Sequence, residues 1–305
     1  MLDVAVAFVT FNRPEPTRAS FARIRSVRPN KLFLVSDAAR PDRPGEDQLV
    51  QQTRQIAQQV DWDCAVYKIY ATSNMGCGLR ISSAITQAMQ FVDRLIVLED
   101  DCVADPSFFS FCDAMLERYE DDERIMAISG DNFQQGISRT DASYYFSKYM
   151  HCWGWATWRR AWEHFSLMIP QWPTFRDAGG LSNWCDSAQE IRYWTEIYDR
   201  CHAGESASWA YPWQLSCWMN HGLTILPDVN LVSNIGFGSD ATHTQRHDPM
   251  TALPTQALTE LWHPNHVSRN HDADAYTDRQ LFSHPNRVGP LKRLRRKLGI
   301  TRRAA

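Results

Sequence analysis

The chain has 305 residues and a formal net charge of −3 at pH 7, and 44% of its residues are hydrophobic. This length can form a sizeable core in one large domain or two, and the slightly negative charge argues against nucleic-acid binding as the function. No run of about 18 apolar residues is present, and the N-terminal segment lacks the basic stretch of a signal peptide, so we expect no membrane span and no leader.

The first 130 residues alternate short apolar segments with segments of helical character. We expect strands at 4–11, 31–36, 64–70, 94–99 and 125–129, separated by helices near 15–26, 46–59, 79–91 and 106–119. This order predicts an α/β fold with a mostly parallel, Rossmann-like central sheet and helices on both faces. In such a sheet, the polar turns at the carboxyl ends of the strands meet in one crevice.

The fourth expected strand ends in three consecutive acids, Glu99, Asp100 and Asp101. Adjacent carboxylates raise one another's pKa, so a site that keeps them ionised usually supplies a divalent cation. All-oxygen ligation suits Mg²⁺ or Mn²⁺, and the carboxyl end of a strand is where α/β sheets hold nucleotide phosphates. The alternative is a helix start with Asp105 as the N-cap and Pro106 after it, which explains Asp105 but not the triplet.

Several common kinds of site are not indicated. No G-x-G-x-x-G follows the first strand and no Walker lysine loop occurs, which argues against dinucleotide-dependent oxidoreductases and P-loop enzymes. The eight cysteines are scattered without a C-x-x-C pair, and several lie in apolar segments. This distribution favours free thiols in a reducing cytoplasm over disulfides or zinc.

From about residue 131 the sequence becomes rich in aromatic residues, and ten of the twelve tryptophans lie between Trp153 and Trp218. Trp155, Trp158 and Trp162 have the spacing of one helix face, for which core packing is the default. Tryptophan also stacks on sugar rings, so we expect about two or three of the ten to contact a ligand.

The C-terminal part contains a strand, a loop and a basic tail. We expect a strand at 223–227 and a flexible loop at 230–244, a kind of segment that often carries function. After Pro285, basic residues surround leucines at helical spacing. This predicts either a short amphipathic helix on an anionic membrane or a frayed, solvated terminus. The changes in composition divide the chain into regions 1–130, 131–250 and 251–305.

The first strand is followed by a basic residue, a later strand ends at an acid, and the acid triplet precedes a helix that begins with Pro, Ser and two Phe. These four motifs are Phe11-Asn12-Arg13, Val35-Ser36-Asp37, Glu99-Asp100-Asp101 and Asp105 to Phe109. They resemble those of the GT-A glycosyltransferases, with a closer likeness to the N-acetylglucosaminyltransferases that act on mannose. The overall pattern is also similar to bacterial family 2-like glycosyltransferases.

The resemblance implies a GT-A fold with a nucleotide-sugar site and an aromatic-rich acceptor side. Asp101 would bind Mn²⁺ or Mg²⁺, which bridges the donor phosphates, and His243 would reach the metal or phosphates after loop closure. Asp37 would accept the N3–H of uracil. The other donor-binding residues implied are Thr10, Asn12, Arg13, Asn74, Arg80, Glu99 and Asp100, and the acceptor-binding ones are Trp153, Trp155, Trp209 and Trp213.

The catalytic base is where the sequence departs from this family. Inverting members carry an acid about a dozen residues before a strand-starting glycine, and counting back from Gly222 gives Ala210. Glu205 and Asp131 are the alternative acids. Either the base has moved to one of them, or the reaction retains configuration, or the chain is catalytically weak.

The sequence therefore predicts a metal-dependent glycosyltransferase, a hexosyl- or N-acetylhexosaminyltransferase. It would transfer a sugar from a nucleotide diphosphate, most simply UDP, to a glycan or lipid-linked acceptor. We expect it in the cytoplasm, with the basic tail at the inner face of the membrane. The alternatives are a nucleotide-sugar-binding relic without turnover and a sugar-1-phosphate nucleotidyltransferase, for which the loop at 10–15 is a poor phosphate cradle. A methyltransferase is disfavoured because no glycine-rich loop follows the first strand.

Overall fold

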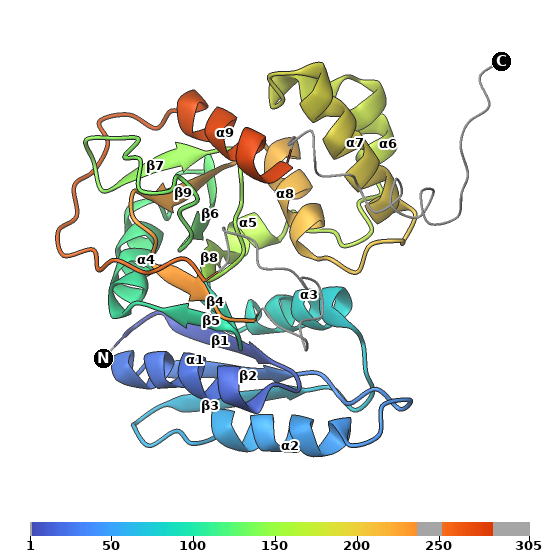
Figure 1. Ribbon diagram of the computed structural model, residues 1–305, viewed down its shortest axis with the longest axis vertical. Coiled ribbons are helices and arrows are strands. Elements are labelled where there is room, and N and C mark those ends of the chain that lie inside the picture. The colour runs from blue at the N-terminus through green and yellow to red at the C-terminus, as the bar shows by residue number, and fades with distance from the viewer. Residues whose placement is uncertain (1, 237–251, 283–305) are drawn as a thin grey trace.

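The computed structural model describes residues 2–236 and 252–282. A mixed sheet of eight strands forms its centre, in the order β3-β2-β1-β4-β8-β6-β9-β7 (Figure 1). The α/β fold class predicted from the sequence is confirmed. In spatial order the strands are β3 (Ala65–Tyr70), β2 (Lys31–Ser36), β1 (Ala5–Thr10), β4 (Arg94–Glu99), β8 (Trp155–Trp158), β6 (Ile125–Ser129), β9 (Leu223–Pro227) and β7 (Tyr144–Ser147).

Parallel pairing dominates the first half of the sheet. β1 pairs in parallel with both β2 and β4, β2 pairs in parallel with β3, and β6 pairs in parallel with β9. All six residues of β1 are buried, as expected for a strand covered on both faces. The antiparallel strands β7 and β8 belong to the same sheet, so the predicted boundary near residue 130 falls inside one continuous sheet.

Helices cover both faces of the sheet, as predicted. On one face, Phe21 and Ile24 of α1 (Pro14–Val27) pack with Phe108 of α4 (Pro106–Arg118) against alternate strand residues. On the other face, Ile81 and Ile85 of α3 (Cys77–Ala88) pack against the intervening residues. The remaining helices are α2 (Glu46–Ala57), α5 (Arg159–Trp162), α6 (Trp172–Asp177), α7 (Ala188–His202), α8 (Ala210–Met219), α9 (His271–Thr277), a 3₁₀ turn (Gly180–Asn183) and a π turn (Asp278–Phe282).

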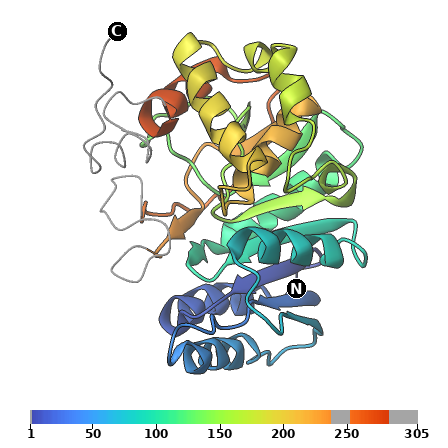
Figure 2. The ribbon, with the colours of Figure 1, turned by 90° about the vertical axis from the view of Figure 1, so that its right-hand side faces the viewer.

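A second hydrophobic core lies among α6, α7 and α8. Four of its large side chains, Trp172, Trp194, Tyr198 and Trp218, are each at most 1% exposed. Figure 2 shows this helical group at the opposite end of the molecule from α1 and α2. Most of the tryptophans clustered in the sequence thus serve packing.

The prediction that Trp155, Trp158 and Trp162 share a helix face is wrong. Trp155 to Trp158 form β8, and only the following four residues are helical. β8 lies antiparallel between β4 and β6, with Trp155 opposite Val97 on one side and Ser129 on the other. Because this segment lies between two strands, its backbone groups find hydrogen-bond partners on both sides. The free energy of this pairing outweighs the helical preference that the spacing of the tryptophans suggests.

A short antiparallel ribbon corrects the prediction of a loop from residue 230. β10 (Val232–Asn234) pairs with β5 (Cys102–Ala104), and Asn234 lies opposite Cys102. The next residue, Ile235, donates its N–H to the carbonyl of Asp101 at 2.8 Å. The ribbon therefore brings a distant segment directly onto the acid triplet.

The described segments contain no helix long and apolar enough to cross a membrane. All eight cysteines are free. The basic tail lies outside the described residues, so its predicted amphipathic helix stays a prediction.

Gly154 offers a test of packing beneath the acid triplet. It has φ +71°, and a Cβ there would lie 2.7 Å from Val232 Cγ2 and 3.2 Å from Leu98 Cδ2. Gly179 has a similar φ of +73° but open space around it. We expect Gly179→Ala to lower the free energy of unfolding by about 1 kcal/mol through backbone strain, and Gly154→Ala by roughly 1–3 kcal/mol more through overpacking. Urea denaturation measures both, and equal losses would contradict the packing seen here.

Candidate functional site

The carboxyl ends of β1, β2 and β4 are aligned by their pairing register. Thr10 lies opposite Ser36, and Val9 lies opposite Glu99. The residues that follow these strands therefore meet at one edge of the sheet, as the sequence predicted. They include Arg13, Asp37 and Asp101.

Arg13 bridges two of the three acids. Its Nη1 donates to Asp101 Oδ2 at 3.0 Å, and its Nη2 donates to Asp100 Oδ1. The N–H of Phe11 donates to the other oxygen of Asp100 at 3.0 Å. Burial alone would lower the pKa of Arg13, but the neighbouring charges of Asp100 and Asp101 outweigh burial and raise it. The guanidinium is thus firmly charged and compensates part of the triplet.

The triplet still carries more negative charge than its surroundings balance. Burial, followed by repulsion from Asp101 and Asp100, raises the pKa of Glu99. Burial also raises the pKa of Asp100, against the opposing effect of Arg13. Two neighbouring carboxyls with raised pKa values indicate that a further cation at this edge would be bound favourably.

The oxygen donors here suit Mg²⁺ or Mn²⁺. Within residues 2–236 and 252–282, no three His, Cys, Asp or Glu side chains are grouped to hold a metal ion. At phosphate sites, however, Mg²⁺ is usually held by one or two carboxylates together with phosphate oxygens. Asp101, with 13% of its side chain exposed against 3% for Asp100, fits that arrangement. His243 lies outside the described residues.

Arg80 is a buried cation at the same edge. It is the fourth residue of α3 and is 7% exposed, and its Nε has no hydrogen-bond partner. Among the described residues it makes no ion pair, and its Nη1 donates to Met75 Sδ at 3.5 Å. Burial lowers its pKa, partly offset by the charge of Asp37. A buried guanidinium with so few partners is poised for an anionic ligand.

Asp37 and Asn74 connect the end of β2 to the start of α3. The Asp37 carboxylate accepts the N–H groups of Ala38 at 2.9 Å, Met75 at 3.0 Å and Gly76 at 2.9 Å. Asn74 donates to the Ala38 carbonyl at 2.7 Å. These bonds fix the turn beside Arg80, and base reading by Asp37 stays a prediction.

Thr10 and Asn12 are engaged within the fold. Thr10 donates to the carbonyl of Val35 at 3.1 Å, and the Asn12 amide donates to Glu46 at 2.9 Å. Both residues lie at the predicted edge. Their side chains hold the β1–α1 turn in place.

The loop that carries Glu205 lies beside the start of α3. Glu205 is exposed, two residues before Ala207. A Cβ on Gly78, at the start of α3, would lie 2.7 Å from the Ala207 carbonyl. Trp209 follows this loop and its side chain hydrogen-bonds to Glu99. Glu205 is therefore on a loop that borders the acid triplet.

Asp131 lies in the interior instead. It is 0% exposed, and its Oδ2 accepts the N–H of Trp153 at 2.9 Å, while Oδ1 has no partner. Burial raises its pKa well above the ordinary value. A carboxyl that is fully enclosed cannot reach an acceptor hydroxyl, so the geometry favours a structural role for Asp131, and its catalytic role stays a prediction.

The four tryptophans predicted to bind the acceptor lie in different environments. Trp155 and Trp213 are 0% exposed in the core, so we assign them to packing. Trp209 stacks on Trp155 with ring centroids 4.9 Å apart and is 3% exposed. Trp153 is half-buried. Trp153 therefore remains the best placed of the four to touch a ligand.

Sequence reasoning missed the close approach of Gly236. A Cβ at this position would lie 2.0 Å from Asp101 Oδ2 and 2.7 Å from Arg13 Nη1. Only glycine allows the strand that leaves β10 to lie against these two side chains. The glycines of this segment were visible in the sequence, but nothing there indicated that one touches the triplet.

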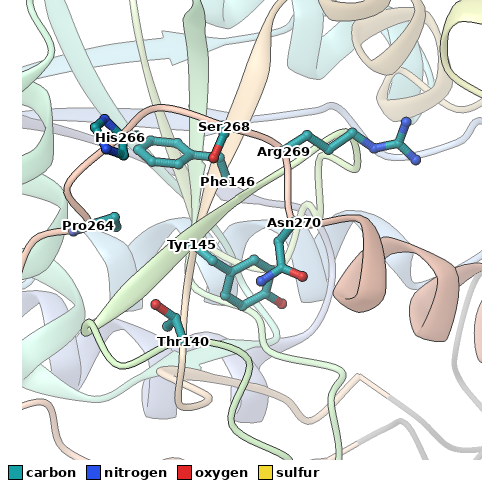
Figure 3. A pocket seen from close by; sticks show the side chains of 8 residues that line it. All are labelled: Thr140, Tyr145, Phe146, Pro264, His266, Ser268, Arg269 and Asn270. Carbon is teal, nitrogen blue, oxygen red and sulfur yellow. The ribbon is translucent and has the colours of Figure 1, made fainter.

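A separate cavity of about 310 Å³ lies at the far edge of the sheet, beside β7 (Figure 3). Arg269 and Asn270 line it, but Arg269 is paired with Asp274 and Asp186, and Asn270 caps α9. These polar groups are already engaged, and no acid lines the cavity. The edge formed by β1, β2 and β4 is therefore the better candidate site.

The comparison with known families supports the resemblance seen in the sequence. The model of the GNT-I family matches residues 83–179, a segment that contains the acid triplet and β8. The likeness to GT-A glycosyltransferases is confirmed over this segment, which is about a third of the chain. No curated protein sequence matches the chain significantly.

Solved structures show distant likenesses. A mannosyltransferase from Pyrobaculum calidifontis in complex with GDP-Man and Mn²⁺ has 12% identity and a TM-score of 0.37, with 72% of this chain and 76% of that one covered. TarS 1-349 from S. aureus has 9% identity and a TM-score of 0.42, over 74% and 58%. A UDP-glucose pyrophosphorylase complexed with UDP-glucose has 8% identity and a TM-score of 0.34, over 53% and 79%. No residue role is taken from them.

Asp131→Asn separates a structural from a catalytic role for this residue. Because the folded-state pKa is raised, the native protein loses stability as pH rises above the unfolded value near 4. Asparagine does not ionise and keeps an acceptor for Trp153. We expect the free energy of unfolding of the variant, relative to that of the native protein, to rise by about 1.4 kcal/mol per pH unit from pH 4 upward. The rise ends where the native carboxyl ionises.

Denaturation at several pH values measures this difference. The exposed Asp121→Asn is the matched control, for which we expect no such trend. A loss of stability in Asp131→Asn that grows as the pH rises would show instead that Asp131 is needed in its ionised form.

Proposed function

We propose that the chain is a glycosyltransferase that takes a hexose or N-acetylhexosamine from a nucleotide diphosphate in the presence of Mn²⁺ or Mg²⁺. The observation that carries this proposal is the presence of both an acid cluster and a buried arginine at one sheet edge. Three acids suit a cation, and the buried Arg80, without an ion pair among the described residues, suits an anion. A nucleotide diphosphate bound with a divalent cation supplies the cation for the acids and the anion for Arg80. The GNT-I match over 83–179 favours sugar transfer as the use of such a site.

Different residues at this edge would bind the metal ion, the phosphates, the sugar and the base. Asp101 would hold the metal, which supplies charge neutralisation for the departing nucleotide. Arg80 would donate to a phosphate from the first turn of α3. Glu99 and Asp100 would accept hydrogen bonds from ribose or sugar hydroxyls. The Asp37 carboxylate, at the end of β2, would accept the N3–H of uracil.

The acceptor would enter from the side of Glu205 and Trp153. Glu205 is exposed on the loop before α8, where it can take a proton from an acceptor hydroxyl. Ala210, the first residue of α8, leaves no acid at the helix itself. Trp153 would stack on a sugar ring of a glycan or lipid-linked acceptor. The basic tail would keep the enzyme near the cytoplasmic face of an anionic membrane, where lipid-linked acceptors lie.

The same edge fits a sugar-1-phosphate nucleotidyltransferase less well. That reaction needs free donors in the β1–α1 turn to cradle a triphosphate. Here the backbone N–H of Phe11 is engaged with Asp100. One donor that the turn could offer to a triphosphate is therefore occupied.

Asp101→Asn tests the metal and nucleotide site. We expect UDP or GDP to bind the native chain with Mn²⁺ and to lose about 10–100-fold in affinity in the variant, because the ligand charge is removed. Isothermal titration of each nucleotide with and without Mn²⁺ measures this, with Asp121→Asn as the control of equal charge change. A nucleotide affinity that is the same with and without Mn²⁺ and the same in Asp101→Asn would remove the basis for the proposal.

Glu205→Gln tests the proton acceptor. We expect turnover of the UDP-sugar or GDP-sugar that binds to fall by about 10²–10⁴-fold while nucleotide affinity stays unchanged. Glu196→Gln, an exposed acid on α7, is the matched control. Full turnover in Glu205→Gln would place the base elsewhere. Nucleotide binding in the native chain without any turnover would identify the relic instead.

A further inference from the structure

Arg13 occupies one of the two carboxylate oxygens of Asp101, and the thiol of Cys102 lies 3.6 Å from the other. Its guanidinium donates to Asp101 Oδ2 at 3.0 Å and to Asp100 with its other terminal nitrogen. A divalent cation at Asp101 would meet this positive group within contact distance. The metal and the guanidinium, both positively charged, therefore compete for the Asp101 carboxylate.

Both partners are held from the main chain, so the contact is built into the fold. The Arg13 carbonyl accepts bonds from the backbone and the hydroxyl of Thr17, at 3.1 and 2.6 Å, which fixes it at the start of α1. The Asp101 carbonyl accepts the N–H of Ile235 at 2.8 Å. Gly236 leaves no room for the two side chains to separate toward β10.

The Arg13 side chain can nevertheless move toward solvent. It is 22% exposed, whereas Asp100 is almost fully buried. A diphosphate entering the crevice would present oxygens that match the guanidinium fork. The guanidinium could then move from Asp101 to phosphate without losing its charged partners.

We propose that Arg13 is an internal counter-cation that keeps free divalent metal off Asp101 until a nucleotide diphosphate arrives. This inference rests on the proposed function and adds a binding order to it. The nucleotide draws Arg13 away, and Asp101 Oδ2 becomes available to the metal at the moment when phosphate oxygens complete its ligands. Metal alone binds weakly, and the two ligands strengthen each other.

The coupling has a defined size and direction. Binding couplings of this kind are typically 5–150-fold, and each ligand must change the affinity of the other by the same factor. Phosphate–metal bridging alone would also couple the two ligands, but it would leave the affinity for metal without nucleotide independent of Arg13. The metal affinity of the nucleotide-free protein is therefore the decisive quantity.

The experiment is Mn²⁺ binding to the full chain, followed by the paramagnetic resonance signal of free Mn²⁺, without and with saturating UDP or GDP. We expect Arg13→Gln to bind Mn²⁺ alone at least about 5-fold more tightly than the native chain, and the gain from nucleotide to shrink. Arg13→Lys keeps the charge but cannot donate to both acids, so we expect an intermediate affinity. Arg18→Gln, an exposed arginine of α1, is the control and should match the native chain.

The outcomes separate the two proposals. Nucleotide-dependent Mn²⁺ binding that needs Asp101, with an unchanged or weaker Mn²⁺ affinity in Arg13→Gln, overturns the role of Arg13 and leaves the proposed function intact. No Mn²⁺ or nucleotide binding in the native chain overturns both. Thermal unfolding of each variant checks the fold. Should Arg13→Gln unfold, Arg13→Lys carries the test, and a native-like affinity in that variant overturns the inference.

Discussion

Charge compensation at the end of β4 is the constraint around which the site is built. Each acid of the triplet holds a different part of the chain. Asp100 binds the β1–α1 turn through Phe11 and Arg13, Glu99 binds the start of α8 through Trp209, and Asp101 binds the segment after β10 through Ile235. Segments more than 100 residues apart are thereby fixed at one point. The acids that would handle a ligand also assemble the walls around it.

Opposite charges are distributed unevenly over this site. Arg13 compensates two acids, while Arg80 feels the charge of Asp37 but is bonded to no carboxylate among the described residues. Buried charges without full compensation cost folding free energy, and proteins keep them mainly where a ligand repays that cost. The imbalance therefore says more about function than any single residue does.

Local patterns were sufficient to predict the first half of the sheet. The apolar runs of β1, β2, β4 and β6 bury both faces of their strands, and Asp105 caps α4 by accepting the N–H of Ser107, so these elements are encoded within a few residues. The segment from Trp155 was predicted wrongly because β8 gains its backbone partners from β4 and β6. Those strands are 26 or more residues away in the sequence, so the spacing of neighbouring residues carries no information about them.

The same distinction decides what could be known of the site. The sequence indicates which residues follow parallel strands, and so Arg13, Asp37 and Asp101 were expected together. It does not indicate which charges pair, since Arg13 is expected to bind the nucleotide-sugar donor and lies against acids. Nor does it separate the enclosed Asp131 from the exposed Glu205, because burial follows from packing across the whole chain. Position along a strand is local information, whereas accessibility and ion pairing, on which the chemistry depends, are properties of the assembled fold.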